Sequence, residues 1–172
     1  MGYTFDVVAA GIDELAIRHP DPKELTLLLA RAKAQAVKRK VQEPAVIITS
    51  DQVVWFQNKI LEKPESEAQA RWYLENAHLP ADTVSAVVVT NTATGKQVES
   101  IDIMTVEMNP FPSELIDAYI KKGDCYNMAG GFDIEDPMIK PYIKAIKGEI
   151  ESGCGLPKQL TERLLQEVGY TQ

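Results

Sequence analysis

The stretch "AVIITSDQVVWF", Ala45–Phe56, decides the expected fold because polar residues separate two apolar segments within it. Ala45–Thr49 has the composition of a short buried strand, and Val53–Phe56 is expected to form a hairpin with Lys59–Leu61. We therefore expect Asp51 just beyond a strand end, where sheets of α/β proteins meet their ligands. Two interpretations of Asp51 stay open: a carboxylate that acts on a cation or a water molecule, or an Asx-turn that closes a loop.

Helical and extended patterns alternate on both sides of this stretch. Asp21-Pro22 is typical of a helix start, and apolar residues at helical spacing predict a helix from Lys23 to about Lys40. Further strands are predicted at Tyr3–Ala10, Val84–Thr90 and Gln97–Met108, and further helices from Ser66, from Pro112-Ser113 to Gly123, and over Leu156–Val168. This order predicts an α/β protein with a mixed sheet. No linker divides the 172 residues, so we expect a single domain over 1–172.

The composition excludes several classes of function. Lys and Arg number 18 against 25 Asp and Glu, and the net charge of -7 argues against non-specific binding to nucleic acid or to an anionic membrane. No apolar run is long enough to span a bilayer. Two cysteines are too few for a disulfide framework and favour a reduced, cytoplasmic protein. With only two histidines, catalysis is expected to rest on carboxylates, lysines and a cation held by oxygen ligands.

Three further residues could act together with Asp51. Glu14 in "GIDE" would be a second acid if its segment lies beside Asp51, and two carboxylates near lysines suit a cation and a triphosphate. Lys33 lies among alanines, which would let its helix approach a neighbour closely; Lys63 precedes a proline, which holds it extended. Taken singly, a lysine in either position is more commonly an ordinary solvated side chain.

A glycine loop late in the chain, "MAGGFDIED", is the last candidate. Gly130-Gly131 allows a close approach of the backbone to a ligand, and Glu135 is one of the acids that follow. No strand–GxGxxG–helix arrangement and no Walker lysine accompany the pair, so the loop is weak support for phosphate binding. It could present a carboxylate to a nucleotide base, or it could be a flexible acidic loop.

Seven segments in order resemble the Maf-like nucleotide pyrophosphatases: "GIDE", "LARAKAQAV", "SDQVV", "LEKP", "AYIKKGD", "MAGGFDIED" and "GLPKQL". The resemblance covers nearly the whole chain. It implies the fold of the inosine triphosphate pyrophosphatases, an elongated twisted mixed sheet flanked by helices, in two lobes with a central cleft. It also implies hydrolysis of nucleoside triphosphates between the α and β phosphates, a housecleaning activity that requires a divalent cation, Mg²⁺ or Mn²⁺. A homodimer is expected from the resemblance alone.

The resemblance also assigns roles to residues of this chain. Asp51 matches the acid that accepts a proton from water or positions it, Glu14 matches the acid of the early turn, and Lys33 and Lys63 match the two lysines. Asp51 and Glu14 are the expected metal ligands.

Two positions bear on the substrate. Where relatives that favour dTTP and UTP have threonine after the aspartate and glutamine in the glycine loop, this chain has Gln52 and Glu135, which resembles the branch that prefers 7-methyl-GTP. The methylated guanine carries positive charge and donor N–H groups, which a carboxylate such as Glu135 suits. A dTTP/UTP-type activity and a preference for ITP or XTP are the alternatives.

The chain departs from the family at its start. The family's Ser-x-Ser-x-x-Arg loop, whose arginine contacts phosphate, has no counterpart before "MGYTFDVV", so we expect a chain truncated at its N-terminus relative to the family. Without that charge clamp, slow turnover is expected, and a nucleotide-binding or regulatory protein is the rival interpretation.

Overall fold

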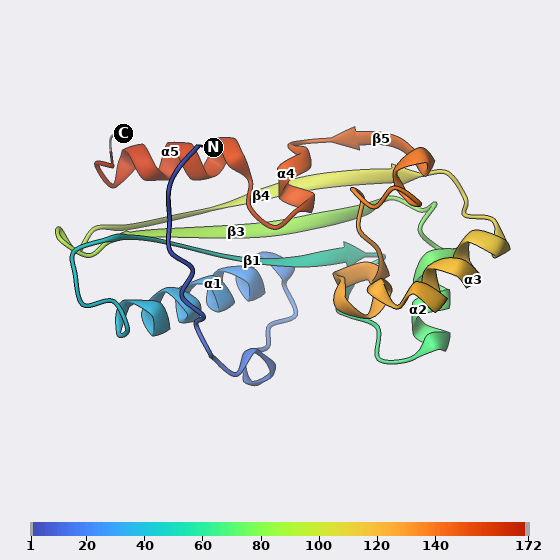
Figure 1. The fold of residues 1–172 in the computed structure, drawn as a ribbon, viewed down its shortest axis with the longest axis horizontal. Coiled ribbons are helices and arrows are strands. Elements are labelled where there is room, and N and C mark those ends of the chain that lie inside the picture. The colour runs from blue at the N-terminus through green and yellow to red at the C-terminus, as the bar shows by residue number, and fades with distance from the viewer. Residues whose placement is uncertain (1, 171–172) are drawn as a thin grey trace. The chain divides into compact units, whose positions relative to one another are not determined.

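The computed structural model describes residues 2–170, which form an α/β protein with a five-stranded sheet (Figure 1). The order in the sheet is β2-β1-β3-β4-β5. The strands are β1 (Val46–Phe56), β2 (Lys59–Leu61), β3 (Ala81–Asn91), β4 (Gln97–Met108) and β5 (Ile143–Lys147). The expected α/β class is confirmed. The sheet, however, is antiparallel: neighbouring strands run in opposite directions, so the parallel pairs of a mixed sheet are absent from the described strands.

Strand β1 is continuous through the polar residues that the sequence analysis took as a break. Asp51 therefore lies within a strand, and the Asx-turn interpretation is wrong. At the far end of β1, Gln57 and Asn58 both have positive φ, as a two-residue hairpin turn requires, and Val54 pairs with Leu61. That part of the predicted hairpin is confirmed.

The helices begin and end close to the predicted residues. They are α1 (Pro22–Lys38), α2 (Glu67–Glu75), α3 (Ser113–Lys122), α4 (Ile150–Gly153) and α5 (Lys158–Glu167). The Asp21 carboxylate caps α1 by accepting from Lys23 N at 2.8 Å, and the Ser66 hydroxyl caps α2 by accepting from Gln69 N at 3.2 Å. Gly123 ends α3 in the left-handed region, at φ 87°. Sequence analysis did not predict α4 or β5.

The chain forms two compact units. Unit 1 consists of 1–52, 85–102 and 155–172, and unit 2 of 53–84 and 103–154. In unit 1, both faces of β3 are covered. Ala86 and Val88 pack with Ala30 and Ala34 of α1, whereas the alternate residues Val87 and Val89 pack with leucines of α5. This double cover explains why β3 is apolar without alternation.

Unit 2 has its own core between α2, α3 and β4. It includes Leu74, Met104, Tyr119, Ile134 and Ile139, all buried. Ile134 and Ile139 come from the loop after α3, so this loop is anchored by apolar side chains rather than lying loosely on the surface.

The N-terminal segment differs from the prediction. Tyr3–Ala10 was expected to be a strand, but 2–13 form neither helix nor strand. Phe5 is 76% exposed and Val7 is 86% exposed, so the alternating apolar pattern has no sheet partner among the described residues. Within the same residues, no helix has the length and apolar character needed to cross a membrane.

Candidate active site

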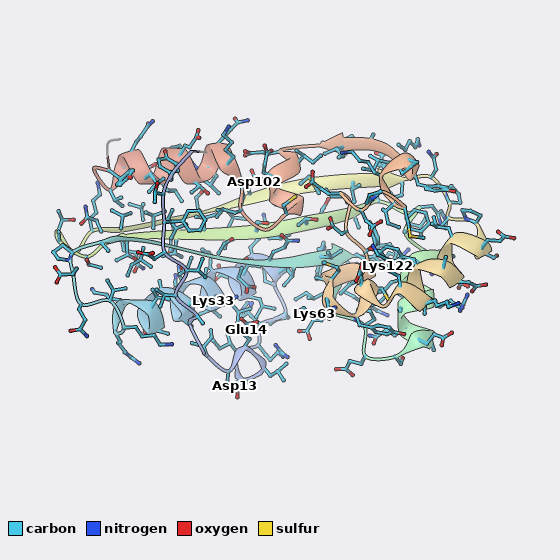
Figure 2. The ribbon with its side chains drawn as sticks, in the orientation of Figure 1. Asp13, Glu14, Lys33, Lys63, Asp102 and Lys122 are labelled. Atoms are coloured by element: carbon cyan, nitrogen blue, oxygen red, sulfur yellow. The ribbon has the colours of Figure 1, made fainter. Side chains whose placement is uncertain are left out.

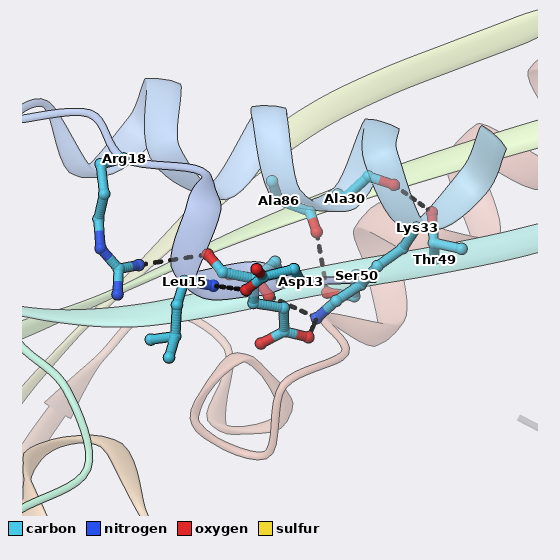
Figure 3. A network of polar contacts seen from close by, with 10 residues as sticks. Asp13, Leu15, Arg18, Ala30, Lys33, Thr49, Ser50 and Ala86 are labelled. Carbon is cyan, nitrogen blue, oxygen red and sulfur yellow. Dashed lines mark hydrogen bonds and ion pairs between the residues drawn. The ribbon is translucent and has the colours of Figure 1, made fainter. Parts of the chain in front are cut away.

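The side chains of Lys33, Asp51 and Glu14 meet in unit 1. Lys33 Nζ lies 2.6 Å from Asp51 Oδ1 and 2.9 Å from Glu14 Oε1. The exposed fraction of the side chain is 9% for Asp51, 20% for Lys33 and 55% for Glu14. Exposure to solvent therefore increases across the group, from the nearly buried Asp51 through Lys33 to Glu14. Figure 2 shows Glu14 beside Lys33, and Figure 3 shows Lys33 reaching down from α1 toward β1.

Helix α1 brings Lys33 to the sheet because small residues flank it. Ala30 is fully buried and Ala34 is 2% exposed where α1 meets β3. The Thr49 hydroxyl of β1 donates to the Ala30 carbonyl oxygen at 2.8 Å (Figure 3). This bond fixes β1 against α1 two residues before Asp51, which sets the distance between Asp51 and Lys33.

Ser50 fixes the other side of β1. Its hydroxyl oxygen lies 2.8 Å from the Ala86 carbonyl oxygen and 2.7 Å from that of Gly155. A Cβ on Gly155 would come within 3.3 Å of Gln52 Oε1, so glycine leaves room for the amide of Gln52. The hydroxyl groups of Thr49 and Ser50, in the half-buried middle of β1, are thus satisfied by distant carbonyl groups, which is why β1 does not break there.

Glu14 is held by the structure around a short turn. The Asp13 carboxylate accepts from Leu15 N at 3.1 Å and caps the 3₁₀ helix η1 (Glu14–Ala16), as Figure 3 shows. On the N-terminal side, Lys40 Nζ donates to the carbonyl oxygens of Ala9, at 2.7 Å, and Ala10, at 2.9 Å. These contacts place Glu14 at Lys33 although its segment belongs to no strand.

Burial and charge shift the pKa values of this group. Burial raises the pKa of Asp51; the Lys33 ammonium opposes that shift, and the charge of Glu14 adds to it. Burial lowers the pKa of Lys33, but the hydrogen bonds to Asp51 and Glu14 outweigh burial and leave the pKa raised. A carboxylate with a raised pKa accepts a proton more readily, so Asp51 suits a general base. Lys33 stays cationic and suits a phosphate.

An open cavity of about 1110 Å³ adjoins this group within unit 1. Glu14 and Lys33 line it, together with 45–50 and apolar residues such as Val37 and Leu165. Its volume slightly exceeds the range of roughly 300–1,000 Å³ that is usual for small-molecule sites. A ligand there would meet the Lys33 ammonium at one wall and apolar side chains at the others.

The two acids fit a divalent cation only in part. Because Glu14 and Asp51 both contact the same ammonium, a positive charge already lies between them. Among the described residues, no group of three or more His, Cys, Asp or Glu side chains gathers. Mg²⁺ commonly takes one or two carboxylates and completes its ligands with water and substrate phosphates, so this pair could supply its protein ligands only after the Lys33 ammonium had moved away.

Lys63 and Glu135 belong to unit 2. Lys63 is exposed next to the buried Pro64, and the neighbouring Glu62 carbonyl oxygen accepts from Gly130 N at 3.3 Å. The glycine loop thus lies against the segment that carries Lys63. A Cβ on Gly130 would lie 3.1 Å from the Val54 side chain. The glycine therefore allows a close approach, as predicted, but the group it approaches is a side chain of the protein and not a ligand.

The structure therefore unites some predicted residues and adds others. Glu14, Lys33 and Asp51 form one group in unit 1, whereas the Lys63 segment and the glycine loop form another in unit 2. Sequence reasoning missed Ser50 and Lys40. A hydroxyl inside a strand needs a partner, which is a signal for Ser50, but nothing near Lys40 in the sequence marks its contact with Ala9.

Comparisons with known proteins agree with these features. The family described as Maf-like protein matches residues 1–168. A 7-methyl-GTP pyrophosphatase of Dictyostelium discoideum is 44% identical over 98% of this chain and 88% of its own length. A nucleoside triphosphate pyrophosphatase of Streptomyces coelicolor is 33% identical over 98% of this chain and 82% of its own. A dTTP/UTP pyrophosphatase of Vibrio vulnificus is 30% identical over 97% of this chain and 89% of its own.

Proposed function

The chain belongs to the Maf-like family, and on that premise we propose that it is a nucleoside-triphosphate pyrophosphatase that acts on 7-methyl-GTP or a similar modified nucleotide. The Lys33–Asp51 contact at 2.6 Å carries this proposal, because it joins a partly desolvated acid to a cation at the wall of a cavity. The names of the relatives, all pyrophosphatases of nucleotides, support the reaction class.

In the proposed reaction, water attacks a phosphorus of the α–β bridge in line with the leaving oxygen. Asp51 orients this water and accepts its proton, which the raised pKa of Asp51 favours. Lys33 and Lys63 neutralise charge on the phosphate oxygens. The bond between phosphorus and the bridging oxygen breaks, and the products are a nucleoside monophosphate and pyrophosphate.

Asp51 and Glu14 would hold Mg²⁺ or Mn²⁺, with the remaining ligands supplied by phosphate and water. When bound, the cation would neutralise charge on the triphosphate. Lys33 lies between the two acids, so it would have to turn toward the phosphates when the cation enters. The requirement for a metal is tested by adding a chelator and then restoring activity with either ion.

Gln52 and Glu135 are the residues that we propose to select the base. Glu135 is exposed, and a carboxylate can accept from the N1–H and amino group of a guanine whose ring is positively charged. The identity to a 7-methyl-GTP pyrophosphatase, 44%, exceeds the 30% identity to a dTTP/UTP pyrophosphatase, and this difference supports the choice of base.

We also propose that the protein is a homodimer located in the cytoplasm. Both cysteines, Cys125 and Cys154, are unpaired, which suits the reducing cytoplasm. A homodimer rests on the family alone and is tested by measuring the mass of the protein in solution.

The test of function is a pyrophosphate-release assay with Mg²⁺ and a panel of 7-methyl-GTP, GTP, UTP, dTTP, ITP and XTP. The proposal requires release above background, with 7-methyl-GTP giving the highest kcat/KM. Glu135→Gln should lower the ratio of kcat/KM for 7-methyl-GTP to that for UTP by about tenfold, the effect of losing a charged hydrogen bond. A higher kcat/KM for UTP and dTTP, or for ITP and XTP, than for 7-methyl-GTP would contradict the proposed base preference. Binding of a nucleotide without release of pyrophosphate would contradict the proposal that the protein is an enzyme.

A further inference from the structure

Helix α3 ends in a lysine that the proposed reaction does not use. Lys122 is the last residue of α3, where the negative end of the helix dipole favours a cation. Its Nζ lies 2.5 Å from Asp136 Oδ2 and 2.8 Å from Asp124 Oδ2, all within unit 2. Figure 2 shows Lys122 at this end of α3.

The two partners of Lys122 differ in burial. The side chain of Asp136 is 7% exposed and that of Asp124 is 47% exposed, so the contact with Asp136 is the better shielded from water and salt. Lys122 is the main cause of the lowered pKa of Asp136. Without Lys122, a buried carboxylate would lack its cation, and its segment would have to move toward water.

Asp136 in turn organises the backbone that follows it. Its Oδ1 accepts from Met138 N at 2.8 Å, and its carbonyl oxygen accepts from Ile139 N at 2.9 Å. The Lys122–Asp136 ion pair therefore fixes a turn and not a single side chain.

A second residue of α3 holds the other end of the same segment. Tyr119, three positions before Lys122 and so on the same helix face, is fully buried, and its hydroxyl oxygen accepts from Asp133 N at 3.2 Å. The Asp133 carboxylate then accepts from Glu135 N at 2.9 Å. Helix α3 thus contacts 133–136 at both ends.

Glu135 lies between these two anchors. Its neighbours Ile134 and Asp136 are buried, at 6% and 8% exposure, whereas Glu135 itself is exposed. Backbone that is held on both sides of an exposed carboxylate suits a recognition group, because the segment that carries the carboxylate need not be ordered when the ligand binds.

We propose that Lys122 is a positioning residue for base recognition: its ion pair with Asp136, together with the Tyr119 hydroxyl, holds 133–136 so that Glu135 presents its carboxylate in one orientation. This inference rests on the proposed function, in which Glu135 reads a cationic purine.

The kinetic test compares matched substitutions on one helix. Lys122→Met removes the charge and keeps the length of the side chain, Lys122→Arg keeps the charge, and Lys121→Met is the control on the exposed neighbour. For Lys122→Met we expect KM for 7-methyl-GTP to rise about tenfold, with kcat for 7-methyl-GTP and KM for UTP within about twofold of wild type. Lys122→Arg should recover most of the loss, and Lys121→Met should show none.

A measurement that does not depend on activity tests whether Lys122 holds the backbone of 133–136. Amide hydrogen exchange over 133–140 should be faster in Lys122→Met than in wild type or Lys121→Met, because these amides depend on the turn at Asp136. Unchanged exchange would overturn the inference.

Two kinetic outcomes separate the inference from the function beneath it. If Glu135→Gln alters the preference for the base and Lys122→Met does not, the positioning role is wrong and the proposed function stands. If wild type releases no pyrophosphate from any nucleotide, the proposed function is wrong, and the exchange experiment still decides whether Lys122 holds the loop.

Discussion

The ammonium of Lys33 lies 2.6 Å from the Asp51 carboxylate, and neither side chain is more than 20% exposed. An ion pair so shielded couples its members more strongly than a surface pair does. The proton affinity of Asp51 is therefore expected to change when Lys33 is moved or removed.

Asp51→Asn keeps the shape of the side chain and removes the base. We expect kcat for pyrophosphate release to fall by about 10²–10⁴-fold, the usual effect of losing general-base catalysis. Circular dichroism should match wild type. Asp117→Asn, which changes an exposed carboxylate paired with Arg71, is the control and should stay near wild-type kcat. Full activity in Asp51→Asn would remove Asp51 from the mechanism.

Lys33→Met should move the pH profile of kcat/KM in a defined direction. Lys33 opposes the burial that raises the pKa of Asp51, so its loss should raise that pKa further. Because ionised Asp51 is the active form in the proposed reaction, activity should fall as the pH drops through this pKa, and the acid limb should shift to higher pH. Lys33→Arg, which keeps the charge, should leave the limb near its wild-type position. A limb that stays in place in Lys33→Met would contradict the coupling.

Lys40→Met should weaken the response to metal more than the chemical step. Lys40 ties Ala9 and Ala10 in place ahead of Glu14, and outer contacts of this kind typically alter metal affinity by about tenfold or more. We expect the Mg²⁺ concentration for half-maximal activity to rise about tenfold, with kcat at saturating Mg²⁺ largely retained. Lys38→Met on the exposed face of α1 is the matched control. An identical Mg²⁺ titration in Lys40→Met and wild type would show that the tether does not hold Glu14.

Gly130→Ala should destabilise the protein through both strain and packing. Gly130 has φ +74°, and an added Cβ would lie 3.1 Å from Val54. Gly95→Ala is the comparison, because Gly95 has φ +76° with no atom within 4 Å of the added Cβ. Strain alone should lower the free energy of unfolding by about 1–3 kcal/mol in Gly95→Ala, and Gly130→Ala should exceed it, as measured by urea unfolding. An equal decrease in the free energy of unfolding in the two variants would mean that the Val54 side chain moves aside and relieves the contact.

The sequence predicts elements well where the signal is local. The helix expected over Lys23–Lys40 is found at Pro22–Lys38, and the strand expected at Gln97–Met108 is found with those bounds. Spacing, caps and a terminal glycine suffice for such elements because each acts within a few residues.

The prediction failed where distant residues decide. Thr49 and Ser50 looked like a break, but their hydroxyl groups are satisfied by carbonyl groups of Ala30, Ala86 and Gly155, so the strand continues. The convergence of Glu14 and Asp51 on Lys33 depends equally on packing that no local pattern encodes. The resemblance names Glu14, Lys33 and Asp51, but it does not give the contact that brings the three side chains together.

The alanines of helix α1 have a consequence for how the protein tolerates change. Ala30 and Ala34 set the gap between α1 and β3, and Lys33 reaches Asp51 across the same gap. A larger side chain at Ala30 is expected to push α1 away from the sheet. The Lys33 ammonium would then lie farther from the Asp51 carboxylate, although the rest of the core would still pack. The size of the side chain at the buried position Ala30 is therefore expected to control the distance between Lys33 and Asp51.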